Sequence, residues 1–167
     1  PDRPEIIAGI DETAGGSWLG VNDFGVVAAI LNRSNSLGPK EGKRSRGELV
    51  LEALDHADAS DAAEAITSIN EKAYRSFNMI LADNRDAFWI KHTETDSIAL
   101  NSIPEGISMI TADDLNDIKS PRIAKYLKRI RKASVPHPGT NDWDAWQKVL
   151  ADPVSYTHLR AHETEYD

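Results

Sequence analysis

Short apolar runs separated by polar turns occupy the first part of the chain. Glu5–Ile10 and Ser17–Asn22 have the length of short strands, and Gly25–Leu31 is a continuous apolar run rich in β-branched residues. Such a run predicts a strand covered on both faces. Asn22–Gly25 predicts a turn, because Asn tolerates left-handed geometry and hydrogen-bonds its own backbone. We therefore expect these three strands to form an antiparallel meander.

The hydrophobic period becomes helical after a polar loop. Ser45-Arg46-Gly47-Glu48 fits a capping box, in which the Ser45 hydroxyl and the Glu48 carboxylate satisfy the first free amides of a helix. Behind it, apolar residues share one helical face at Val50, Ala53, Leu54 and Ala57. In a second helix from about Ser60 they recur at Ala62, Ile66, Ile69 and Ala73. We expect both helices to pack against a sheet.

The second half of the chain predicts three or four strands and then two helices. The strands are expected at Phe77–Asp83, Ala87–His92, Ser97–Asn101 and Gly106–Thr111. A helix capped by Ser120, with Pro121 at its first position, has an apolar stripe at Ile123, Tyr126, Leu127 and Ile130. A final helix capped by Thr140 or Asn141 has Trp143, Trp146 and Leu150 on one face, and we expect the two tryptophans to be core anchors, with a ligand-stacking pair as the alternative. This order of elements lacks βαβ alternation and favours an α+β fold.

Composition and charge narrow the classes of function. The length of 167 residues suits one domain, and no apolar run is long enough to span a membrane, so we expect a cytoplasmic protein. The net charge of −8 argues against general binding of a nucleic-acid backbone, so we expect no nucleic-acid partner, although a local basic patch stays open. Zero cysteines exclude disulfides, thiolate metal sites and a cysteine nucleophile within these residues. We expect no cofactor.

Both ends of the chain look non-native. The stretch Val154–Thr164 resembles the translation of a sequencing adapter, so we predict a domain over residues 1–153 and a non-native tail over 154–167. His158 and His162 stand at i and i+4, a spacing also found in zinc sites, but this tail carries them. The start at Pro1 has neither Met nor signal peptide, and we expect a fragment lacking its natural N-terminus.

Four segments together resemble the NRDE (transport and Golgi organisation) family. They are Ala14-Gly15-Gly16-Ser17-Trp18-Leu19-Gly20-Val21-Asn22, then Val27–Arg33, Arg46-Gly47-Glu48-Leu49-Val50 and Phe77-Asn78. The likeness covers about residues 1–152 and is closest to bacterial members. It implies an Ntn-hydrolase-like αββα sandwich, in which two antiparallel sheets lie between helix layers.

The resemblance also implies an N-terminal nucleophile, typically cysteine, and an Asn-Arg-Asp-Glu motif that follows it. Neither is present, and we interpret Asn84-Arg85-Asp86-Ala87 as a hairpin turn. Members and related amidases carry an Asn where Ala112 stands here, so a conventional amidase site would lack one oxyanion donor. We expect the chain as given to be inactive in this chemistry.

The candidate site residues come from the same segments. Asn32, at the end of the apolar strand, is the candidate catalytic residue, because its amide resembles the oxyanion donor of related amidases; the alternative is a structural hydrogen bond. Gly15 and Gly16, beside Trp18, are expected either to bring backbone amides close to a ligand or simply to form a tight entry turn. The full set of predicted binding residues is Gly16, Trp18, Asn22, Arg33, Arg46 and Asn78.

Two clusters of basic residues fit either an anionic partner or a solvated surface. Arg33, Arg44 and Arg46 are expected to line one mouth and bind a carboxylate or another anion, with surface solvation as the alternative. The segment from Lys119 to Lys132 carries seven cations and no acid, which fits an anionic partner or a solvated face matched to the helix dipole.

Two functions therefore stay open. One is an Ntn-type hydrolase of carbon–nitrogen bonds when an N-terminal cysteine is present. The other is a non-catalytic protein that binds an anionic or hydrophobic small molecule, since the resemblance extends to eukaryotic members linked to haem mobilisation and to lipid and Golgi homeostasis.

Overall fold

The computed structural model describes residues 5–11 and 15–152. The adapter-like tail, its pair His158 and His162, the start at Pro1 and Ala14 all lie outside the described residues. The chain divides into two compact units, residues 1–104 and 105–167, and each is considered by itself.

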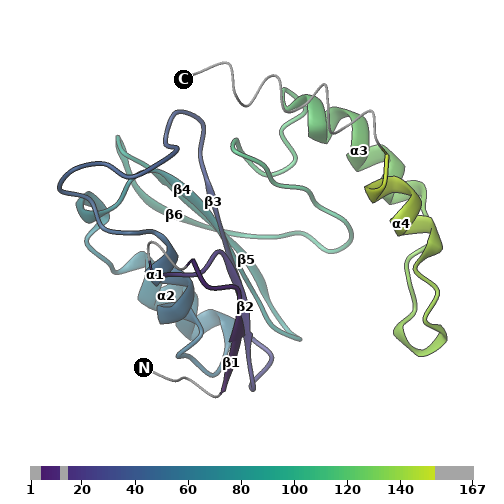
Figure 1. Cartoon of the computed structure of the whole chain (residues 1–167), viewed down its shortest axis with the longest axis horizontal. Helices are drawn as coiled ribbons and strands as arrows, with labels where there is room; N and C mark the ends of the chain where they lie inside the picture. Colours follow the sequence, from purple (N-terminus) through teal and green to yellow (C-terminus); the bar gives the residue numbers. More distant parts are fainter. Residues whose placement is uncertain (1–4, 12–14, 153–167) are drawn as a thin grey trace. The chain divides into compact units, whose positions relative to one another are not determined.

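The first unit contains a six-stranded antiparallel sheet whose strands follow chain order (Figure 1). The strands are β1 (Ile6–Ala8), β2 (Leu19–Asn22), β3 (Val27–Asn32), β4 (Phe77–Ala82), β5 (Ala87–Thr93) and β6 (Asp96–Ser102). The predicted meander is confirmed and extends through all six strands. Every strand of the described residues belongs to this one sheet, so the α+β class is confirmed and the two-sheet sandwich stays a prediction.

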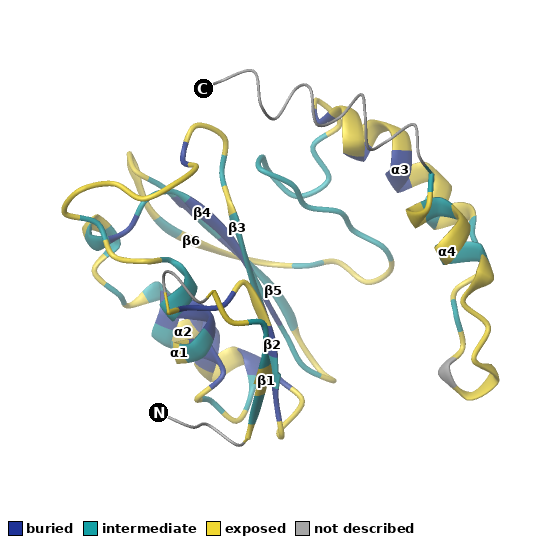
Figure 2. Ribbon diagram, in the orientation of Figure 1, coloured by how far each residue is buried: buried dark blue, intermediate teal, exposed yellow. Residues whose placement is uncertain are grey.

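Helices α1 (Gly47–Ala53) and α2 (Ala59–Thr67) and the short 3-10 helix η1 (Glu71–Ala73) connect β3 to β4. Both α-helices contact the sheet, as their apolar faces predicted (Figure 1). Alternate strand residues point to this face because side chains of a strand alternate. The fully buried core between helices and sheet includes Leu49, Val50, Leu54, Ile66, Phe77, Met79 and Leu81 (Figure 2).

The predicted coverage of β3 on both faces is wrong at one position. Val27 is 37% exposed, whereas Ala28, which faces the helices, is fully buried. The apolar character of this strand therefore reflects β-propensity as well as burial.

The predicted capping box at the start of α1 is also wrong. The N-cap is Arg46, and it makes no side-chain capping bond. The Ser45 hydroxyl accepts a hydrogen bond from the Gly47 amide at 3.3 Å, but the Glu48 carboxylate is engaged by Arg44 and by the Tyr74 hydroxyl instead. A charged partner and a phenol outcompete the backbone amide for this carboxylate. In α2 the Asp58 side chain caps the helix by accepting from the Asp61 amide.

The hairpin between β4 and β5 turns at Asn84 and Arg85, which confirms the interpretation of Asn84-Arg85-Asp86-Ala87 as a turn. Asp83 holds it together: its carboxylate accepts hydrogen bonds from the amides of Ala59, Arg85 and Asp86 at 2.8–2.9 Å. The Ala59 bond also fastens the start of α2 to the hairpin. These amide donors lower the pKa of Asp83 from 3.8 to about 2.

We expect Asp83 to make stability depend on pH between about pH 4 and pH 2. Its pKa is lower in the folded state, so its contribution is present above the unfolded-state pKa and is lost as pH falls through the folded-state value. The shift corresponds to about 2 kcal/mol of unfolding free energy.

Urea unfolding at several pH values measures this contribution of Asp83. Asp83→Asn should remove this part of the pH dependence, whereas Asp86→Asn, a control in the same hairpin, should keep it. Parallel pH profiles for wild type and Asp83→Asn would contradict the assignment.

The second unit contains helices α3 (Pro121–Lys132) and α4 (Asp144–Leu150) and the 3-10 helix η2 (Pro138–Thr140). The prediction of Ser120 as N-cap and Pro121 at the first position of α3 is confirmed, although Ser120 makes no side-chain capping bond. Its apolar stripe is buried at Ile123, Tyr126 and Leu127.

Three predictions for the second unit are wrong. Residues 106–111 form no strand, because Asn116, at a φ of 59°, pairs with the backbone of Met109 through both its amide and its side-chain oxygen. The N-cap of α4 is Trp143 rather than Thr140 or Asn141. Trp143 is 39% exposed, so of the two tryptophans expected in the core only Trp146 is partly buried, and Leu150 is 73% exposed.

Within residues 5–11 and 15–152, no helix has the length and apolar character that crossing a membrane requires. The same residues contain no cluster of His, Cys, Asp or Glu side chains suited to hold a metal ion.

Candidate functional site

A pocket of about 790 Å³ opens in the first unit beside the end of β3 and the start of α1. Its wall combines the segment around Gly16, the last residues of β3, the loop before α1 and one residue that precedes β4. The lining residues are Asp11, Gly16, Ser17, Trp18, Ile30, Leu31, Asn32, Gly38, Pro39, Lys40, Lys43, Arg44, Ser45, Arg46, Gly47 and Arg75. Four predicted site residues, Gly16, Trp18, Asn32 and Arg46, therefore lie together.

Two glycines bring the backbone of one wall against the start of α1. The Ser17 amide donates to the Gly47 carbonyl at 3.0 Å. A Cβ on Gly16 would lie 2.6 Å from the Gly47 carbonyl carbon, and a Cβ on Gly47 would lie 3.0 Å from the Ser17 nitrogen. Gly16 has no room for a side chain, and a side chain at Gly47 would be tightly crowded, because the neighbouring atoms at both positions belong to backbone. Gly15 has a different role: its φ of 71° is a left-handed conformation that glycine adopts without strain in the turn before Gly16.

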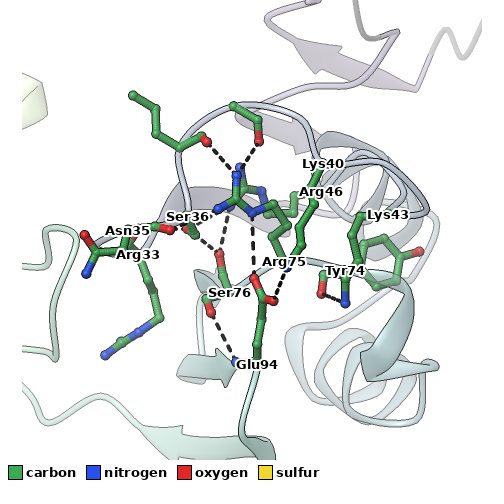
Figure 3. Close-up of polar contacts among 12 residues, drawn as sticks. Arg33, Asn35, Ser36, Lys40, Lys43, Arg46, Tyr74, Arg75, Ser76 and Glu94 are labelled. Atoms are coloured by element: carbon green, nitrogen blue, oxygen red, sulfur yellow. Dashed lines mark hydrogen bonds and ion pairs between the residues drawn. The ribbon is translucent and has the colours of Figure 1, made fainter. Parts of the chain in front are cut away.

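The loop between β3 and α1 is held by two arginines from different segments (Figure 3). Arg46 donates to the Ser36 hydroxyl at 3.0 Å and to the Ser76 carbonyl at 2.8 Å. Arg75 donates to the carbonyls of Asn35, Leu37 and Gly38. These acceptors are neutral, so they fix each guanidinium without cancelling its charge. Burial, and next to it the charge of Arg75, lower the pKa of Arg46, which nevertheless stays a cation.

One carboxylate partly balances these charges. Glu94 forms an ion pair with Lys40 at 3.1 Å and lies 3.7 Å from the Arg75 guanidinium (Figure 3). The Lys40 ammonium is the main reason that the pKa of Glu94 is lowered. Lys43 instead donates to the carbonyls of Lys72 and Tyr74. Five cations thus line the pocket, and among the described residues that line it Asp11 is the only acid.

Arg44 has a carboxylate partner of its own. Its guanidinium lies 2.7 Å from Glu48, whose same oxygen accepts the Tyr74 hydroxyl at 2.6 Å. Burial and this hydrogen bond raise the pKa of Tyr74, so the phenol stays protonated. The cluster keeps Glu48 away from the pocket interior.

Asn32 and Trp18 supply the remaining polar and aromatic surface. Asn32 is exposed at the end of β3, and its side chain makes no hydrogen bond to the rest of the described chain. Trp18 is 56% exposed and its ring packs over Gly9, where an added Cβ would come within 2.9 Å of the indole.

The structure places the other predicted site residues elsewhere. Arg33 donates to the buried Asn78 side chain at 2.7 Å, and Trp89 donates to the same oxygen. Asn78 alternates with the core residues Phe77 and Met79, so this group lies on the sheet face opposite α1 and α2. The expectation that Arg33 shares a mouth with Arg44 and Arg46 is therefore wrong.

Asn22 also lies outside the pocket lining. It is buried and hydrogen-bonded to backbone on both sides, with its amide donating to the Leu54 and His56 carbonyls. Its oxygen accepts from the amides of Phe24 and Val26. The predicted turn is confirmed by the bond from the Gly25 amide to the Asn22 carbonyl.

Sequence reasoning missed Lys40, Lys43 and Arg75 as lining residues, and Glu94 as the partner of Lys40 and Arg75. The sequence offered an indication for Lys40 and Lys43, since both stand in the polar loop before Arg46. It offered no indication for Arg75 and Glu94, because each is a single charged residue next to the end of a strand, and no local pattern connects either residue to the loop.

These features define an α+β protein with a basic pocket at one end of an antiparallel sheet. The model of the Transport and Golgi organisation 2 family matches residues 1–165, and the chain belongs to this family. The match includes part of the stretch that we interpret as non-native, so the domain boundary at residue 153 stays a prediction. A comparison with curated proteins found no match.

Proposed function

We propose that the pocket binds a small molecule that has an anionic group and an apolar body. The observation that carries this proposal is the surplus of fixed positive charge around one cavity. Within the described residues, Arg46 and Lys43 donate to neutral oxygens, and the carboxylate of Glu94 is shared by Lys40 and Arg75. An anion that enters the pocket meets cations that are already positioned, so little reorganisation opposes binding.

The apolar part of the wall supports a ligand with a hydrophobic body. Trp18, Ile30, Leu31 and Pro39 line the same cavity as the cations. An indole that is half exposed in the free protein gains buried surface when a flat or aliphatic group covers it. Pockets that bind small molecules usually combine such a wall with a few fixed polar groups.

We expect Arg46→Gln to weaken binding of haem and of a long-chain acyl-CoA, the two probes for this ligand class, by about 10- to 100-fold. Loss of one charge-assisted contact in a partly buried site costs about 1.5–3 kcal/mol. Trp18 lies in the wall, so quenching of tryptophan fluorescence during titration measures the affinity. Arg85→Gln, an exposed arginine in the β4–β5 turn, is the matched control and should bind like wild type.

Thermal unfolding of each variant separates loss of binding from loss of fold. If neither probe bound wild type saturably, or if Arg46→Gln bound as wild type does, the proposed anion site would be wrong.

The second candidate function is hydrolysis of a carbon–nitrogen bond in the same pocket, by the mechanism of N-terminal nucleophile hydrolases. It is supported by Asn32, whose amide lines the pocket and is available to donate to a developing oxyanion. The 167 residues contain no cysteine, so a cysteine nucleophile would have to be added.

The test compares a chain extended to begin with cysteine against the same chain beginning with alanine, on simple acyl amides. Only the cysteine form should hydrolyse them, and Asn32→Ala should slow it by about 10²–10³-fold. Equal rates for the cysteine and alanine forms would exclude this candidate and leave ligand binding unaffected.

A further inference from the structure

Helix α3 in the second unit presents a row of exposed cations. Its apolar face, formed by Ile123, Tyr126 and Leu127, is buried, and every lysine and arginine of the helix is exposed. Lys125, Lys128 and Lys132 recur at i, i+3 and i+7, so they form one stripe on the side away from the apolar face. The segment 119–132 holds seven of the 19 cations of the chain and none of its 27 acids.

Within residues 105–152, the described part of the unit, Asp152 neutralises part of this stripe. Asp152 pairs with Arg129 and, at 3.7 Å, with Lys125. Arg131 donates to the Ile107 carbonyl, which is neutral. Lys119, Lys128 and Lys132 form no ion pair with any residue that the structure describes. The position of the cations near the helix C-terminus accounts for some of them through the helix dipole, but Lys119 precedes the helix and Lys128 stands in its middle.

Exposed apolar residues accompany the cations. Ile118 and Val135, three residues before and three residues after α3, are 74% and 71% exposed. In α4, which contacts α3, Leu150 is 73% exposed, and Trp143, the N-cap of α4, is 39% exposed. A duplex or single-stranded nucleic acid would use the cations but gains little from isoleucine, valine and leucine. The interface of an anionic bilayer uses both kinds of side chain, because headgroups attract lysine while apolar groups and tryptophan enter the boundary of the acyl chains.

We propose that the face of α3 carrying Lys125, Lys128 and Lys132, together with Lys119 and the exposed Ile118 and Val135 just beyond the two ends of the helix, docks the protein on the surface of an anionic membrane. Charge complementarity determines which part of the protein faces the membrane. The chain carries a net charge of −8, so an anionic membrane surface attracts α3 and repels the acidic remainder of the protein. Binding is peripheral and reversible, since the apolar contribution consists of single side chains rather than a continuous inserted face.

Vesicle co-sedimentation of the full chain tests the proposal. Vesicles of phosphatidylcholine with about one third phosphatidylserine should bind the protein, pure phosphatidylcholine vesicles should not, and binding should fall steeply with salt. Lys119→Glu/Lys128→Glu/Lys132→Glu should weaken binding by about 100-fold, because each lysine near an anionic surface contributes about 1 kcal/mol. These three lysines form no ion pair in the described chain, so their replacement leaves the contacts of Asp152 intact.

Three controls make the result specific. Arginine at the same three positions should bind like wild type, and so should Lys72→Glu, an exposed lysine of the first unit. Ile118→Ser/Val135→Ser should weaken binding several-fold without changing its dependence on salt.

Three outcomes would overturn the proposal. The first is equal sedimentation with neutral and with anionic vesicles, and the second is vesicle binding that the triple charge reversal does not change. The third is vesicle binding that the two serine substitutions do not change, together with tighter binding to duplex DNA than to anionic vesicles. The last result would assign the stripe to a nucleic acid. None of these results bears on ligand binding by the pocket of the first unit.

Discussion

Replacing Asn22 with alanine is expected to lower the unfolding free energy by about 3 kcal/mol, the largest loss among the substitutions considered. The side chain makes four hydrogen bonds with backbone groups, two given and two accepted. They fasten the end of α1 to the β2–β3 turn. Alanine would leave two carbonyls and two amides in a largely buried region without these partners, at about 1–3 kcal/mol for each group that water does not reach.

Urea unfolding measures this loss, and two further variants define its origin. Asn22→Asp keeps the acceptor and loses both donors, so it should be destabilised because its carboxylate faces two carbonyls. Asn101→Ala removes a surface amide whose described hydrogen bond, to Trp89, is 3.4 Å long, and should change stability by less than about 0.5 kcal/mol. If Asn22→Ala were as mild as Asn101→Ala, the turn would not depend on this side chain.

Gly16→Ala should disturb both stability and ligand binding. The new methyl group would sit 2.6 Å from the Gly47 carbonyl carbon and 2.7 Å from the Gly47 Cα, so one backbone segment has to move. We expect a loss of about 2–3 kcal/mol, in the range of overpacked cores. Because Gly16, Gly47 and Arg46 line one pocket, the movement should also weaken binding of the acyl-CoA probe.

Gly25→Ala is the matched control for this prediction. Gly25 has a φ of 85° in the β2–β3 turn and nothing within 4 Å of an added Cβ. Alanine there costs only backbone strain, about 1–2 kcal/mol, and leaves the pocket unchanged. Equal affinity of Gly16→Ala and wild type for the probe would show that the pocket does not depend on this close approach.

The alternation and helical period of the sequence were sufficient to predict the six strands and the helix pair. These patterns gave a wrong prediction where a single long-range or side-chain contact determines the local backbone conformation. The run at 106–111 has the composition of a strand, yet Asn116 satisfies the Met109 backbone and removes the need for a sheet partner. The Glu48 carboxylate likewise leaves the helix start for Arg44 and Tyr74.

The candidate site was predicted in part for the same reason. Gly16, Trp18, Asn32 and Arg46 stand in segments whose local pattern singled them out. Arg33 follows Asn32 directly, but neighbouring residues of a strand point to opposite faces, and so it meets Asn78 behind the sheet. Arg75 and Glu94 reach the pocket through contacts 37 to 54 residues away along the chain, which no local pattern encodes.

The insertion of both helices between β3 and β4 has a consequence for the order of folding. The hairpins β4–β5 and β5–β6 close over turns of a few residues, whereas pairing of β3 with β4 must close a loop that runs from Asn32 to Phe77. Closing the longer loop costs more chain entropy before any contact repays it. We therefore expect β4–β6 to form early and the register of β3 on β4 to form late. The pocket, whose walls come from both sides of that late pairing, would then be assembled in the last step.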